Sequence, residues 1–153
     1  WTRKSIMLFP THLLVVIPVA FETGLSVPIL LAGSALPDII DKSLAAMGLT
    51  EPYHSIAHSI FTVAVLTALG FLYKPLLAFS LAYGVHVLLD VVQVGINEPS
   101  GNWRFIFWPV RFPENPLKLP PVNFLKHYIG TEAFYLEIFL WLATGVYLVL
   151  GVG

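Results

Sequence analysis

The stretch PLLAFSLAYGVHVLLDVVQVGI, residues 75–96, decides how this chain folds. It is apolar over enough residues to form a helix that crosses a bilayer, which takes about 20 residues. Pro75 suits the first turn of such a helix. The stretch nevertheless contains His86 and Asp90, whose spacing of four residues places both side chains on one helical face. Because ionisable groups at membrane depth are costly, this face predicts a functional site.

The composition of the whole chain favours a membrane protein. Of its 153 residues 57% are hydrophobic and 11% charged, and the mean hydropathy is +0.80, whereas soluble domains average about 25% charged residues. The net charge of −1 does not favour a nucleic-acid partner, and the absence of cysteine excludes disulfides and thiolate metal sites. We expect one all-α integral membrane domain over residues 1–153.

Apolar segments on both sides of this stretch predict further helices. We expect about five, at about residues 6–21, 27–47, 55–73, 75–96 and 132–150. Pro37 is expected to kink or end the second helix. Residues 97–130 are rich in prolines and in aromatic residues interleaved with Arg104 and Arg111, which is typical of a loop at the membrane interface.

The distribution of basic residues predicts the orientation of the bundle. With five crossings, Lys74 falls alone on one side of the membrane. The other side receives Arg3, Lys4, Lys42, Arg104, Arg111, Lys118 and Lys126. By the positive-inside rule, the N-terminus and the loop 97–130 are expected in the cytoplasm.

In this topology the ionisable residues share one layer near the cytoplasmic face, which scattered structural residues would not do. We predict that they bind metal, since imidazole and carboxylate suit zinc, manganese, iron or nickel. The predicted ligands are His12, Asp38, Asp41, His58, His86 and Asp90. The alternatives are a hydrogen-bonded His86–Asp90 pair that joins helices, surface acids at Asp38 and Asp41, and helix–helix contacts of His12.

Two further residues are candidates for proton transfer in catalysis. His54 precedes His58 by four residues and is a predicted proton donor or substrate contact, with a metal ligand or an interfacial cap as the alternatives. Glu137 lies about one and a half turns into the last helix, in the same layer as the predicted ligands. It is predicted to act as a base or to hydrogen-bond to the metal ligands and so orient them.

At these residues the chain resembles the membrane-bound, metal-dependent hydrolase family, small inner-membrane proteins also described as binding the SOS repressor. The motifs are Thr11-His12, Pro37-Asp38-Ile39-Ile40-Asp41, His54 to His58-Ser59, His86-Val-Leu-Leu-Asp90 and Trp108-Pro109, in the family's order. The segment from Leu36 to Lys42 looks most like archaeal and related prokaryotic members. Many family members carry His-Arg-Gly before Thr-His-Ser, and this chain lacks that arginine, so no role of the arginine carries over. The resemblance implies a multi-pass protein of the prokaryotic inner membrane.

The expected chemistry is hydrolysis at one or two divalent ions, zinc foremost, that activate water. A site near the interface favours an ester or phosphoester, with membrane lipid as a natural partner or substrate. One alternative is a scaffold or regulatory subunit with a structural metal, in which the loop 97–130 docks a protein partner. Another is an ion or proton transporter, although the outer halves of the segments carry almost no polar residues.

Overall fold

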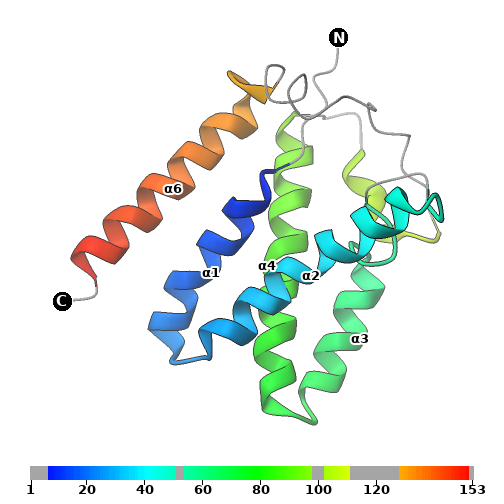
Figure 1. Ribbon diagram of the computed structural model, residues 1–153, viewed down its shortest axis with the longest axis horizontal. Helices are drawn as coiled ribbons and strands as arrows, with labels where there is room; N and C mark the ends of the chain where they lie inside the picture. The colour runs from blue at the N-terminus through cyan, green and yellow to red at the C-terminus, as the bar shows by residue number, and fades with distance from the viewer. Residues whose placement is uncertain (1–6, 51–53, 98–101, 111–127, 152–153) are drawn as a thin grey trace.

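The computed structural model describes residues 7–50, 54–97, 102–110 and 128–151 (Figure 1). Within them the chain forms helices joined by turns, with no strand, so the predicted all-α class is confirmed. In chain order the elements are α1 (Phe9–Thr23), α2 (Val27–Ala46), α3 (Ile60–Gly70), α4 (Lys74–Asn97), the short 3₁₀ helix η1 (Asn102–Phe107) and α6 (Glu132–Leu150).

Helix α4 is the centre of the bundle. It contacts α1, α2, α3, α6 and η1, and α2 crosses it obliquely (Figure 1). Helix α6 packs mainly against α1 and diverges from α4 towards its C-terminal end (Figure 1). The helix that carries His86 and Asp90 is therefore the one that most of the other elements touch.

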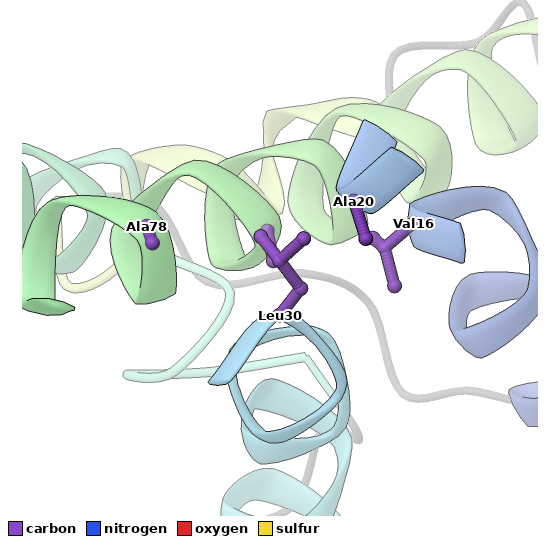
Figure 2. Packing of buried hydrophobic residues seen from close by; sticks show 5 residues of the cluster. Val16, Ala20, Leu30 and Ala78 are labelled. Atoms are coloured by element: carbon purple, nitrogen blue, oxygen red, sulfur yellow. The ribbon is translucent and has the colours of Figure 1, made fainter. Parts of the chain in front are cut away.

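An apolar cluster holds α1, α2 and α4 together. Val16 and Ala20 of α1, Leu30 of α2, and Ala78 of α4 are all buried there (Figure 2). The helices come very close, because a Cβ added at Gly33 would lie 2.3 Å from the carbonyl oxygen of Phe79. Only glycine allows α2 to approach the α4 backbone at this point.

The distribution of polarity is inverted relative to a soluble protein. Large apolar side chains are exposed on the surface, among them Phe139, Leu142 and Leu88. Among the described residues, 15 polar or ionisable residues are buried against 13 hydrophobic ones. Two helices, Lys74–Ile96 and Glu132–Leu150, are long and apolar enough to cross a membrane, whereas α1 and α3 are shorter apolar helices. Five crossings remain a prediction.

The observed helix boundaries differ from the expected ones in two instructive places. Helix α3 begins at Ile60 rather than at residue 55, because the Ser59 side chain caps it by accepting a hydrogen bond from Phe61 N at 3.2 Å. His58 therefore precedes the helix. Pro37 lies inside α2 and does not end it.

The other helix boundaries differ less from the expected ones. Helix α1 starts at Phe9 and runs to Thr23, slightly later than expected. Helices α4 and α6 are close to their expected positions. Of the predicted interfacial loop, Asn102–Phe107 forms η1, whereas residues 98–101 and 111–127 lie outside the described part of the chain.

Candidate metal centre

Most of the predicted ligands converge at one place in the bundle. They come from the beginning of α1, the second half of α2, the α2–α3 connection and the second half of α4. The converging side chains are His12, Asp38, His54, His58, His86 and Asp90. All except His54 are nearly or completely buried. The structure thus brings together residues that are up to 78 positions apart (His12 to Asp90, 90 − 12).

The carboxylate of Asp90 lies among the four imidazole rings. Its Oδ1 is 3.3 Å from His12 Nε2. Its Oδ2 is 3.1 Å from His58 Nε2, 3.3 Å from His86 Nε2 and 3.6 Å from His54 Nε2. Asp90 is 1% exposed, and neither oxygen makes a well-aligned hydrogen bond to any described residue. A buried carboxylate without a hydrogen-bond donor is costly unless a cation balances it.

The donor atoms form two groups that can each hold a metal ion. Within each group, one donor atom per residue lies within 4.8 Å of the others. The first group is His12, Asp38 and His86, and the second is His54, His58 and Asp90. Around a tetrahedral ion with bonds of about 2.1 Å, neighbouring donors lie about 3.4 Å apart. In the second group Asp90 Oδ2 lies 3.1 Å from His58 Nε2 and 3.6 Å from His54 Nε2, which matches this spacing, and in the first group Asp38 Oδ1 lies 3.9 Å from His86 Nε2. The distances of 3.2–3.3 Å from Asp90 to His12 and His86 and from His58 to His86 connect the two groups.

Asp41 lies behind His58 and outside both groups. Its Oδ2 is 2.7 Å from His58 Nδ1, which leaves His58 Nε2 facing the other donors. The same carboxylate accepts hydrogen bonds from Ser55 N at 2.6 Å, Ser55 Oγ at 2.7 Å and Ala57 N at 3.1 Å. These contacts fix the α2–α3 connection and the orientation of the His58 ring. Direct ligation by Asp41 stays a prediction, and its contacts favour a positioning role.

His54 forms the edge of the site. Its side chain is 12% exposed, and its ring stacks on Phe105 of η1 with centroids 4.5 Å apart. Burial lowers the pKa of His54, and the nearby His58 lowers it further. Burial alone would also lower the pKa of His58, but the hydrogen bond to Asp41 and the negative charges of Asp41 and Asp90 outweigh it and raise this pKa to about 9. A metal ion bound at His58 would release its proton.

Gln93 belongs to the same face of α4 and was missed in the sequence. It is 0% exposed, and neither polar atom of its amide has a hydrogen-bond partner among the described residues. It follows Asp90 by three residues and His86 by seven, so the helical repeat that linked His86 to Asp90 extends to it. This helical repeat could have identified Gln93 from the sequence.

Glu137 is buried but lies outside both groups of donors. Its Oε1 accepts a hydrogen bond from Leu8 N at 2.5 Å, immediately before α1. One turn further along α6, Trp141 Nε1 donates to Thr11 Oγ1 at 2.9 Å. These contacts attach α6 to the chain next to His12. The predicted role of Glu137 as a base stays a prediction.

No protein-family model, curated protein or solved structure matches this chain. The family resemblance therefore remains an expectation.

Proposed function

We propose that this protein is a membrane-embedded, metal-dependent hydrolase of a prokaryotic inner membrane. The observation that carries this proposal is the buried Asp90 carboxylate, which four histidine nitrogens approach within 3.1–3.6 Å. A set of imidazole and carboxylate donors without thiolate suits zinc, with manganese, iron and nickel as alternatives. Six converging donors exceed the usual four ligands of one zinc ion, which favours two ions.

Each converging residue has a role in this proposal. One ion is held by His12, Asp38 and His86, and the other by His54, His58 and Asp90. A bound divalent ion lowers the pKa of water towards about 7 and so provides a nucleophile for an ester or phosphoester. His54 is the partly exposed donor, so it is placed to exchange protons with solvent. Asp41 holds His58 in the orientation that the site requires.

The distribution of residues supports a membrane location. Exposed leucine and phenylalanine side chains on α4 and α6 suit contact with lipid, and buried ionisable residues suit an interior shielded from it. The basic residues favour five crossings with a cytoplasmic N-terminus. The α2 end that carries Asp38 would then face the cytoplasm, so the substrate would be a lipid ester or another molecule near that interface.

The first test is the metal content of the detergent-purified protein, measured by mass spectrometry. We expect one or two tightly bound divalent ions in the wild type, and loss of this metal in His86→Ala and Asp90→Ala. Glu132→Gln removes an exposed carboxylate at the start of α6 and should leave the metal unchanged. The metal-loaded protein is then screened against phosphoesters and lipid esters. Stoichiometric metal in the alanine variants would refute the proposed site.

A second candidate is a membrane scaffold whose metal joins the helices. It is favoured by the near-complete burial of the donors and by their origin in α1, α2 and α4. A structural ion has no open coordination position, whereas a catalytic ion keeps one. Cobalt-substituted protein distinguishes the two, because added anions should change its visible spectrum only if a position is open.

A further inference from the structure

A pocket of about 440 Å³ reaches the candidate metal centre from the side of α1 and α2. It is lined by Phe9, Asp38, Ile39, Lys42, Ser43 and Ala46. Asp38 belongs to the first group of donors, so the pocket touches the site itself. The other walls are mostly apolar and include one lysine. Apolar walls with a few placed polar groups are typical of small-molecule sites.

The two oxygens of Asp38 face different partners. Oδ1 lies 3.8 Å from His58 Nε2 and 3.9 Å from His86 Nε2, towards the other donors. Oδ2 lies 2.6 Å from Lys42 Nζ. One carboxylate therefore separates the Lys42 ammonium from the histidines. An anionic group that enters the pocket beside Asp38 comes within reach of both the centre and Lys42.

Lys42 is partly exposed, whereas its partner Asp38 is buried. Its side chain is 39% exposed, whereas that of Asp38 is 3% exposed, and its ammonium lies 6.0 Å from the centroid of the Phe9 ring. A metal ion bound to Asp38 would neutralise part of the carboxylate charge and so weaken the ion pair between Asp38 and Lys42. A lysine ammonium is a common partner of phosphate oxygens.

We propose that this pocket binds a phosphate monoester group, with Lys42 holding its charge next to the metal centre. This inference rests on the proposed function and names its substrate class. The apolar walls at Phe9, Ile39 and Ala46 would receive the organic part of the molecule. Ile39, which lines the pocket, is 53% exposed, so the pocket has an apolar residue at the surface from which a lipid can enter.

The test uses the full chain in detergent, loaded with zinc and freed of excess zinc. Inorganic phosphate is titrated calorimetrically into the wild type, Lys42→Gln, Lys42→Arg and the control Lys74→Gln, which alters a lysine at the distant start of α4. We expect Lys42→Gln to keep its zinc but to bind phosphate about tenfold more weakly or worse. Lys42→Arg should stay close to the wild type, and Lys74→Gln should equal it.

Two results would overturn the inference while leaving the proposed function intact. One is full zinc occupancy with phosphate affinity that does not depend on Lys42. The other is loss of zinc in Lys42→Gln alone, which would make Lys42 a neutraliser of Asp38. A wild type that takes up none of zinc, manganese, iron or nickel would refute the proposed function, and the inference with it. Zinc content, measured first, separates these cases.

A second experiment asks whether the phosphate group belongs to a lipid or to a soluble molecule. Ala46→Trp narrows the pocket one helical turn from Lys42. If Ala46→Trp weakens the binding of a short-chain phosphatidate but not of inorganic phosphate, the ligand is a lipid headgroup with its tail along the wall. If both bind as in the wild type, the ligand is a soluble phosphate monoester. Either result supports the pocket, provided that Lys42→Gln weakens both ligands.

Discussion

The bundle has two different interior regions, an apolar cluster around Leu30 and a polar cluster around Asp90. Around Leu30 and Ala78 the contacts are apolar (Figure 2). The backbones of α2 and α4 come so close there that Gly33 has no space for a side chain. Around Asp90 the same helices α1, α2 and α4 bury imidazole rings and carboxylates. Burial of the first kind stabilises by itself. Burial of the second kind costs free energy unless each polar group finds a partner. The first region stabilises the fold without a ligand, and the second contains the residues that could hold a metal ion.

Cavity formation in the apolar region should give the largest loss of stability. Leu30 is 0% exposed, so Leu30→Ala should lower the free energy of unfolding by about 2–5 kcal/mol. Thermal unfolding in detergent, followed by circular dichroism, measures the change. Leu88→Ala on the exposed side of α4 is the control and should have a small effect. If Leu30→Ala also lost its metal, the two interiors would not be independent.

Removal of metal should destabilise only the polar region. An ion that binds the folded state alone stabilises it by about 2.7 kcal/mol when its free concentration is 100 times its Kd. A chelator should therefore lower the Tm of the wild type and of Leu30→Ala by similar amounts. It should leave Asp90→Asn unchanged. Equal melting temperatures of the wild type with and without chelator would contradict a metal-stabilised interior.

Loss of the Asp41 carboxylate should weaken the site without removing a converging donor. Asp41→Asn should lower metal affinity by about 10- to 100-fold, because His58 would lose the partner that orients its ring. Competition with a coloured chelator measures the affinity. Ser55→Ala removes one hydrogen bond to the same carboxylate and should have a smaller effect. A complete loss of metal in Asp41→Asn would instead indicate direct ligation.

Loss of the hydrogen bond between α6 and α1 should have the smallest effect on stability and on metal affinity. Trp141→Phe removes the hydrogen bond to Thr11 and should cost about 1 kcal/mol. Because Thr11 adjoins His12, a small decrease in metal affinity is expected as well. Thermal unfolding and the chelator competition report the two effects. A larger effect on metal than that of Asp41→Asn would place α6 in the site.

The helices and the main donors could be predicted from the sequence because both depend on local patterns. Apolar runs mark the helices, and the spacing of His86 and Asp90 places them on one face. The convergence of His12, Asp38 and His58 with them was predicted from a shared membrane layer, which needs only helix length and direction.

What escaped prediction depends on contacts between distant segments. The late start of α3 follows from the Ser59 cap and from hydrogen bonds that Asp41 accepts from the α2–α3 connection. Asp38 and Asp41 look equivalent in the Pro37–Asp41 motif. The sequence therefore could not show that Asp41 contacts His58 Nδ1 instead of joining the converging donors. The attachment of Glu137 to the start of α1 joins residues 129 positions apart. No local pattern encodes such pairings.

The formal charges of the buried carboxylates limit what can fill this site. With metal bound and every histidine unprotonated, Asp38, Asp41 and Asp90 contribute −3 and Lys42 contributes +1, so the residues sum to −2 (−3 + 1). In an environment of low polarity, net charge is expensive. One divalent ion brings the sum to zero, whereas two leave +2 (−2 + 4). A phosphate monoester dianion would cancel that excess. The number of ions in the site therefore selects the charge of the molecule that binds beside them.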